Sequence, residues 1–141
     1  MTTKTGVKRL EVFPQTAEIN NKGHLVIGGC DTVELANEYG TPLYVFDEAE
    51  LRGRCREFKT EFGKRYAKTT VSYSPKAFIA KAMIKLVEEE GLALDVVSGG
   101  ELAFARAAGF PANRIHFAGN NKSKEELELA VKEGIGHIDV D

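Results

Sequence analysis

The feature that most constrains the fold of this chain is a regular order of short apolar segment, capped helix and terminating glycine that begins at Thr41. Segments rich in β-branched and aromatic residues favour strands, and a helix after each one carries the chain back to start the next strand alongside. This order is typical of a parallel α/β fold. We therefore expect residues 41–141 to form a parallel sheet with crossover helices.

The individual elements are predicted from local signals. Strands are expected at the apolar runs, residues 43–46, 70–73, 92–97, 115–118 and 137–140. Helices are expected at residues 47–62, 77–90, 98–108 and 123–133, each followed by a glycine. Asp47, Ser98 and Ser123 each stand three positions before a glutamate, which is the spacing of a helix-starting capping box.

The N-terminal part of the chain has a different pattern. Residues 1–23 contain several turn formers and predict an arm or irregular strands. A short strand and a capped helix that starts at Asp31 are expected to follow, and this helix should end at Gly40. The sequence therefore divides into an N-terminal arm with a short helix, residues 1–40, and an α/β part, residues 41–141.

The composition is that of an ordinary soluble globular protein, with 28% charged residues, 43% hydrophobic residues and a net charge of -2. Neither nucleic acid nor a membrane is indicated as a partner. Basic residues are interleaved with acidic ones, and no apolar run approaches the roughly 20 residues that span a bilayer. The N-terminus lacks the apolar core of a secretory signal, so the expected location is the cytoplasm. Cys30 and Cys55 are isolated, and no metal site is expected.

The length indicates a part of a larger protein. A complete (β/α)8 barrel takes about 250 residues, whereas this chain has 141. The last predicted strand has no helix after it, although a parallel strand is normally covered on both faces. We therefore interpret the chain as a fragment of a longer protein.

A single lysine lies where a predicted strand meets a predicted helix. Pro75 keeps Ser74 extended and suits the first turn of a helix, so Lys76 is expected at the carboxyl end of the strand. That end carries the active site in α/β barrels, and an amine among apolar neighbours loses its proton readily and forms an imine with a carbonyl cofactor. The alternative is a solvated lysine at the start of an exposed helix.

Two further strand ends carry polar or glycine-rich loops. The first contains Ser98, Gly99 and Glu101, and the second contains Asn120 and Asn121. The backbone N–H of Gly99, together with that of the glycine after it, can approach an anion at the start of a helix. The alternative for Glu101 is a plain helix cap, and the two asparagines are also common turn residues.

Asp95 interrupts an otherwise apolar predicted strand. A carboxylate in a covered strand needs a cation or hydrogen-bond donors, and Lys76, one strand away, is the expected partner. His116, in the next strand, is interpreted as a residue that faces the barrel or a helix and not as a catalytic base.

Three segments together resemble a known family. They read YSPKAF at residues 73–78, DVVSGGEL at 95–102 and FAGNNKS at 117–123. In this order and spacing they are similar to the diaminopimelate decarboxylase family, which belongs to the fold-type III enzymes that use pyridoxal 5′-phosphate (PLP) and are related to alanine racemase. The resemblance implies that residues 41–141 form the first part of a PLP-binding (β/α)8 TIM-like barrel.

The resemblance also implies roles for single residues. Lys76 is the expected catalytic residue, which binds PLP covalently. The expected cofactor-binding residues are Lys76, Asp95, Ser98, Gly99, Glu101, Asn120 and Asn121. The implied reaction is the decarboxylation of a small amino acid, meso-2,6-diaminopimelate, to L-lysine, the last step of bacterial lysine biosynthesis, by a cytoplasmic homodimer.

Other parts of the family's site are expected beyond Asp141, including a C-terminal β-domain against which residues 1–40 would pack. The chain alone is therefore expected to be inactive. Many relatives have Ala-x-Lys-Ala-Asn around the lysine, whereas Pro75 stiffens this junction here. The alternatives are another fold-type III enzyme, such as a polyamine-pathway decarboxylase or an amino-acid racemase, and a non-catalytic PLP-binding fragment.

Overall fold

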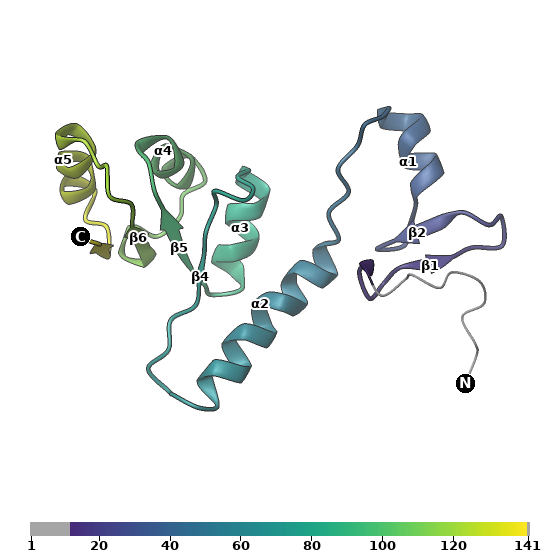
Figure 1. Cartoon of the computed structure of the whole chain (residues 1–141), viewed down its shortest axis with the longest axis horizontal. Helices are drawn as coiled ribbons and strands as arrows, with labels where there is room; N and C mark the ends of the chain where they lie inside the picture. The colour runs from purple at the N-terminus through teal and green to yellow at the C-terminus, as the bar shows by residue number, and fades with distance from the viewer. Residues whose placement is uncertain (1–11, 141) are drawn as a thin grey trace. The chain divides into compact units, whose positions relative to one another are not determined.

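The structure is a computed structural model that describes residues 12–140 (Figure 1). The chain forms two compact units, one ending at Arg54 and the other beginning at Cys55. Helix α2 (Glu48–Gly63) contains the boundary between them. No helix within the described range is both long enough and apolar enough to cross a membrane.

The first unit contains a three-stranded antiparallel sheet, in the order β1-β2-β3, and helix α1. Its elements are β1 (Glu18–Ile19), β2 (Leu25–Ile27), β3 (Cys30–Asp31) and α1 (Thr32–Tyr39). The predicted short strand and the helix after it are confirmed. The arm or irregular strands expected before them include the regular strand β1, and residues 1–11 of that arm lie outside the described residues.

Asp31 fixes the start of α1. Its carboxylate accepts hydrogen bonds from the amides of Val33 at 2.9 Å and Glu34 at 3.3 Å. Asn20 Nδ2 donates to the same carboxylate at 2.8 Å, and His24 Nδ1 lies 2.9 Å from it. Burial raises the pKa of Asp31, but these hydrogen bonds outweigh burial and lower the pKa to about 2. The helix therefore begins at an ionised carboxylate whose two oxygens both take part in hydrogen bonds.

The strand predicted at residues 43–46 is wrong. The structure has neither helix nor strand there, and Tyr44 is 90% exposed. A strand needs a partner backbone to pair with, and an apolar run within one segment cannot reveal whether that partner is present.

The helix predicted after this segment is confirmed as α2. Asp47 Oδ1 accepts a hydrogen bond from the amide of Glu50 at 3.1 Å, as the capping signal predicted. The Thr16 hydroxyl also donates to Asp47. This second hydrogen bond lowers the pKa of Asp47 even though the carboxyl is buried.

The second unit is a four-stranded parallel sheet in the order β4-β5-β6-β7. Figure 1 labels β4, β5 and β6 of this sheet. Its elements after α2 are β4 (Ser72–Tyr73), α3 (Lys81–Glu89), β5 (Ala93–Val96), α4 (Gly99–Ala107), η2 (Ala112–Arg114), β6 (Ile115–Phe117), α5 (Lys124–Glu133) and β7 (His137–Ile138). The expected parallel α/β fold and its four predicted strands in this unit are confirmed. Consecutive strands lie side by side because each helix returns the chain to the start of the next strand.

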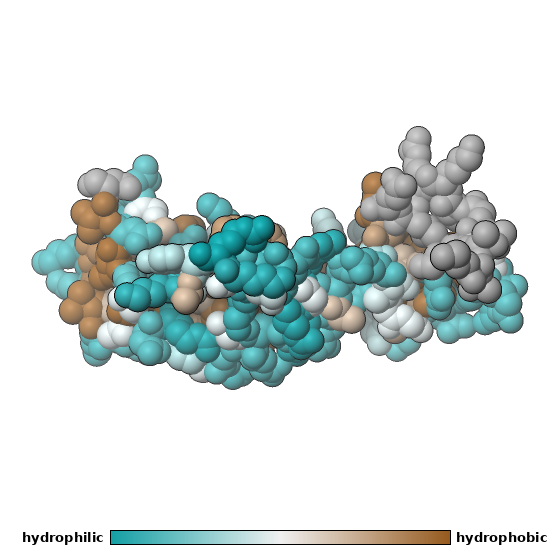
Figure 2. Space-filling model, turned by 90° about the horizontal axis from the view of Figure 1, so that it is seen from below, coloured by the Kyte–Doolittle hydropathy of each residue, from teal (hydrophilic) through white to brown (hydrophobic). Residues whose placement is uncertain are grey.

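The two faces of this sheet differ in polarity. Four residues of one face are at most 1% exposed: Leu94, Val96, Ile115 and Phe117. Apolar side chains of α3 and α4 are buried as well and complete the core. Asp95 and His116 alternate with these residues and therefore lie on the opposite face. Figure 2 shows hydrophobic surface gathered at the end of the unit where α5 and the last described residues lie.

The predicted helix start at Ala77 is wrong, because α3 begins at Lys81. Ala80 is extended, with φ -154° and ψ 154°, and the preceding residues form a loop. The Tyr73 hydroxyl donates to the carbonyl of Phe78 at 2.7 Å. This bond holds the loop to the end of β4, a contact that the local helix signal does not include.

An ion pair joins α2 to the residue that follows α3. Arg56 Nε and Nη2 each donate to the Glu90 carboxylate at 2.7 Å. Glu90 is only 8% exposed, and Lys59 Nζ donates to its carbonyl oxygen at 2.6 Å. The buried carboxylate is therefore held by a bidentate guanidinium contact, the strongest geometry for such a pair.

Candidate functional site

The parallel order of the second unit brings three loops to one edge of its sheet. Carboxyl ends of neighbouring parallel strands lie at the same edge, and the loops after β4, β5 and β6 therefore meet there. These loops and the first turn of α4 contain Lys76, Ser98, Gly99, Glu101, Asn120 and Asn121. Asp95 lies within β5, close to its carboxyl end.

The side chain of Lys76 is exposed in the turn after β4. Its amine is therefore accessible, and the apolar surroundings expected for it stay a prediction. Within residues 12–140 the structure has no ion pair between Lys76 and Asp95, so the expected partnership of these two side chains is also not observed. Two positions earlier, Ser74 Oγ is buried with no hydrogen-bond partner among the described residues. The turn combines an accessible amine with an unsatisfied hydroxyl.

Asp95 belongs to a polar row across three strands. It pairs in register with His116 of β6, and His116 pairs with His137 of β7. The two imidazole rings lie 4.5 Å apart between centroids, at 66° to each other. Asp95 and His116 are half-buried and His137 is exposed. The sequence did not predict a role for His137, because only the register between β6 and β7 brings it beside His116.

Ser98 and Glu101 organise the start of α4. Ser98 Oγ accepts a hydrogen bond from the amide of Glu101 at 3.3 Å, as the capping signal predicted. Glu101 Oε2 accepts instead from the amide of Val97 at 2.7 Å, one residue before the position that a capping box would use. Both side chains therefore hold the backbone between β5 and α4.

The amide of Gly99 is already bound to an anionic group of the protein. It donates to Glu126 Oε1 at 2.6 Å, although the two residues are 27 positions apart in sequence. The sequence predicted that the amides here could approach an anion, and the anion beside Gly99 is this carboxylate. Glu126 was predicted only as the capping partner of Ser123, because nothing in the local pattern indicates its reach to α4.

Asn120 and Asn121 are exposed in the loop after β6. Asn120 lines a shallow depression of about 240 Å³ together with Gly119, Lys122 and residues of α5 and β7. Lys122 Nζ donates to the carbonyl of Gly119 and lies 5.8 Å from the centroid of the Phe117 ring. The depression is therefore an open hollow beside the loop after β6, with both polar and apolar side chains in its lining.

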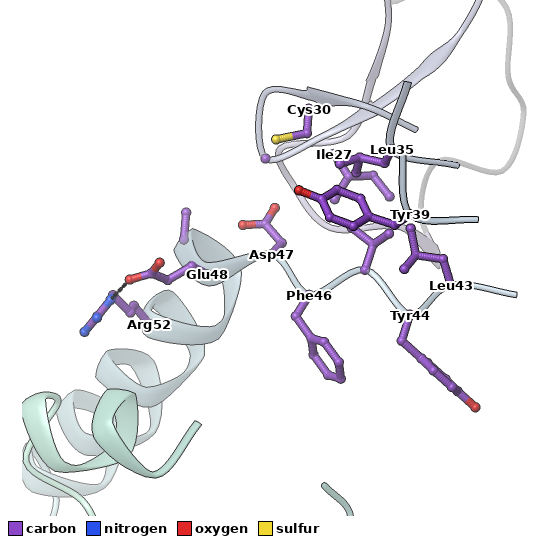
Figure 3. A pocket seen from close by; sticks show the side chains of 13 residues that line it. Ile27, Cys30, Leu35, Tyr39, Leu43, Tyr44, Phe46, Asp47, Glu48 and Arg52 are labelled. Atoms are coloured by element: carbon purple, nitrogen blue, oxygen red, sulfur yellow. Dashed lines mark hydrogen bonds and ion pairs between the residues drawn. The ribbon is translucent and has the colours of Figure 1, made fainter. Parts of the chain in front are cut away.

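A larger hollow of about 770 Å³ lies in the first unit and is lined mainly by apolar side chains (Figure 3). Tyr44 and Phe46 extend from the irregular segment before α2, on the opposite side from Ile27 and Cys30 (Figure 3). No predicted site residue lines this hollow. Within residues 12–140, no group of three or more acidic, histidine or cysteine side chains is arranged to hold a metal ion.

Comparison with known proteins gives the following similarities. Residues 48–141 match the family model described as pyridoxal-dependent decarboxylase, pyridoxal binding domain. The diaminopimelate decarboxylases of Bacillus methanolicus and Bacillus subtilis (strain 168) are each 59% identical to the chain, over 129 and 126 residues. These matches cover 92% and 89% of this chain and 30% and 29% of those proteins. The chain thus spans about 30% of the length of the curated relatives it matches.

Solved structures give the same similarity. The diaminopimelate decarboxylase of M. jannaschii, in co-complex with L-lysine, is 36% identical with a TM-score of 0.80, over 90% of this chain and 30% of that chain. The diaminopimelate decarboxylase of Helicobacter pylori, complexed with L-lysine, is 28% identical with a TM-score of 0.65, over 79% of this chain and 28% of that chain.

Proposed function

The chain belongs to the family of pyridoxal-dependent decarboxylases, and we propose that the complete protein uses PLP to convert meso-2,6-diaminopimelate into L-lysine and carbon dioxide. One observation carries this proposal: a chain 59% identical to two diaminopimelate decarboxylases has an accessible lysine, Lys76, at the carboxyl edge of its parallel sheet. Because the chain spans about 30% of those relatives, the proposal concerns the complete protein.

The residues present fit PLP. Its aldehyde condenses with an accessible primary amine, and Lys76 supplies one. The buried Ser74 hydroxyl without a partner among the described residues lies two positions away. We propose Lys76 as the residue that binds the cofactor covalently. The proposed residues around the cofactor are Asp95, Ser98, Gly99, Glu101, Asn120 and Asn121.

The proposed reaction replaces a carboxylate by a proton. The bond between an α-carbon and its carboxylate breaks, carbon dioxide leaves, and a proton is added to that carbon. PLP, when bound, supplies an acceptor for the electron pair that the broken bond releases. Lys76 Nζ holds the cofactor before the substrate binds and afterwards is an amine that carries a proton near the reacting carbon.

The substrate class is a small amino acid. This substrate class is supported by the solved structures of two relatives, the diaminopimelate decarboxylases of M. jannaschii and Helicobacter pylori, which contain L-lysine. We also propose that the complete protein works as a homodimer in the cytoplasm, as the resemblance to this family implies.

The test is an assay of the full-length protein for carbon dioxide release from meso-2,6-diaminopimelate, with ornithine and arginine as the alternative decarboxylase substrates. Alanine is tested in a separate assay for racemisation, because racemisation releases no carbon dioxide. Activity on meso-2,6-diaminopimelate alone is expected. Release from ornithine or arginine instead, or racemisation of alanine, would contradict the substrate assignment.

The lysine is tested separately. Borohydride reduction of the PLP-loaded protein should leave a stable adduct on Lys76, located by peptide mass spectrometry. Lys76→Ala should lose the adduct and lower turnover by roughly a hundredfold or more. Lys81→Ala, which changes an exposed lysine at the start of α3, is the matched control and should keep both. An adduct on another residue would overturn the assignment.

A further inference from the structure

A single carboxylate ties two of the three loops of the candidate site together. Glu126 Oε1 accepts a hydrogen bond from the amide of Gly99 at 2.6 Å, and Oε2 accepts from the amide of Ser123 at 2.8 Å. Ser123 Oγ in turn accepts from the amide of Glu126 at 3.2 Å, which completes the capping box of α5. The loop after β5 and the loop after β6 are therefore bound to the same side chain.

The backbone is shaped to admit this carboxylate. A Cβ atom on Gly99 would lie 3.1 Å from Glu126 Oε1 and 3.2 Å from Glu126 Cγ, which is closer than most side chains tolerate. The same two loops also approach each other at Gly119, where φ is 93° and a Cβ atom would lie 3.4 Å from the carbonyl oxygen of Val97. Gly99 thus permits the close contact with the carboxylate, and the positive φ of Gly119 favours a glycine in the second loop.

The surroundings of Glu126 favour its ionised form. The amide of Ser123 and then that of Gly99 lower the pKa of Glu126, against its partial burial, which raises it. Its carboxylate also lies at the N-terminus of α4, where the helix carries partial positive charge. Glu126 is therefore ionised at neutral pH, and both its oxygens are engaged by the loops.

We propose that Glu126 is a positioning residue, which sets the spacing between the Ser98–Glu101 turn and the Asn120–Asn121 turn and so shapes the cofactor site between them. The hydrogen bond from the amide of Gly99 to Glu126 joins the two turns in addition to the strand pairing, in which the amide of Ala118 donates to the carbonyl of Val96 at 2.8 Å. The inference rests on the proposed function, because the proposed cofactor neighbours lie on these two turns.

The experiment compares Glu126→Gln with Glu125→Gln in the full-length protein. Glu126→Gln keeps the length of the side chain but replaces one acceptor oxygen by an NH2 donor, which cannot accept from a backbone amide. Glu125 is exposed on the first turn of the same helix, and Glu125→Gln changes the net charge by the same amount as Glu126→Gln. The readouts are the PLP dissociation constant, the absorbance band of the bound cofactor, and hydrogen–deuterium exchange in the peptide that contains Gly99.

Glu126→Gln should raise the PLP dissociation constant by about tenfold, shift the cofactor band, and speed amide exchange at Gly99. Glu125→Gln should change none of these. A purely structural role would lower the unfolding midpoint but leave the PLP dissociation constant of the folded protein unchanged, and that result would overturn the proposal.

A second variant keeps the test valid if Glu126→Gln fails to fold. Gly99→Ala pushes a methyl group against the carboxylate and should weaken PLP binding in the same direction. Gly53→Ala, in α2, is its control because a Cβ atom there meets nothing within 4 Å. Unchanged PLP affinity in Gly99→Ala would refute the role of the contact. Failure of the decarboxylation assay would refute the proposed function instead, and amide exchange at Gly99 would still report on Glu126.

Discussion

The ion pair between Arg56 and Glu90 offers a quantitative test of how the second unit is held together. The perturbation is Arg56→Ala, which removes both 2.7 Å hydrogen bonds to a carboxylate that is only 8% exposed. Glu90→Gln and the double variant complete a double-mutant cycle. These substitutions act on the contact between α2 and the end of α3 and touch no residue of the candidate site.

The magnitude follows from the unequal exposure of the two partners. A hydrogen bond to a charged group contributes about 1.5–3 kcal/mol. The Arg56 side chain is 66% exposed, so water replaces part of the lost contact, as at exposed ion pairs worth about 0–1 kcal/mol. We therefore expect Arg56→Ala to lower the free energy of unfolding by about 2 kcal/mol, with a coupling energy between the two residues of about 1 kcal/mol.

The assay is urea unfolding of the full-length variants, followed by far-ultraviolet circular dichroism at constant pH and salt. Arg65→Ala is the control, because both members of its ion pair with Glu61 are largely exposed, and it should change the free energy of unfolding by less than about 0.5 kcal/mol. If Arg56→Ala is as mild as Arg65→Ala, or if the effects of Arg56→Ala and Glu90→Gln simply add, the ion pair does not stabilise the unit and the reasoning from burial is refuted.

Two further predictions concern the pH dependence of stability and the core. The pKa of Asp31 falls from an ordinary value of 3.8 to about 2 on folding, so its contribution to stability is fully present above about pH 4 and is lost as the pH falls toward 2. Thermal unfolding should be measured from pH 6 down to pH 2. Over this range Asp31→Asn should lose less stability than the unaltered protein. An equal loss in both would count against the hydrogen-bonded carboxylate. Phe117→Ala should lower the free energy of unfolding by about 3–5 kcal/mol, because Phe117 is fully buried and the truncation leaves a cavity. Urea unfolding measures this loss against Phe104→Ala, at a ring that is 44% exposed, and equal losses would contradict the assignment of Phe117 to the core.

The sequence alone determined the features that depend on neighbours along the chain. The caps at Asp31, Asp47 and Ser123 were predicted from residues two or three positions away, and the structure confirms each of them. Alternating or continuous apolar runs predicted the four parallel strands, because burial of one face selects that pattern. The position of Lys76 after a strand follows from the same local signals.

The tertiary structure alone decided the features that depend on residues far apart in sequence. The 43–46 segment lacks a strand because pairing needs a partner, and α3 starts late because Tyr73 holds the loop before it. The row of Asp95, His116 and His137 exists only through the register of three strands. Glu126 reaches Gly99 across 27 positions because parallel strands deliver their loops to one edge, a consequence of topology that local propensities do not contain.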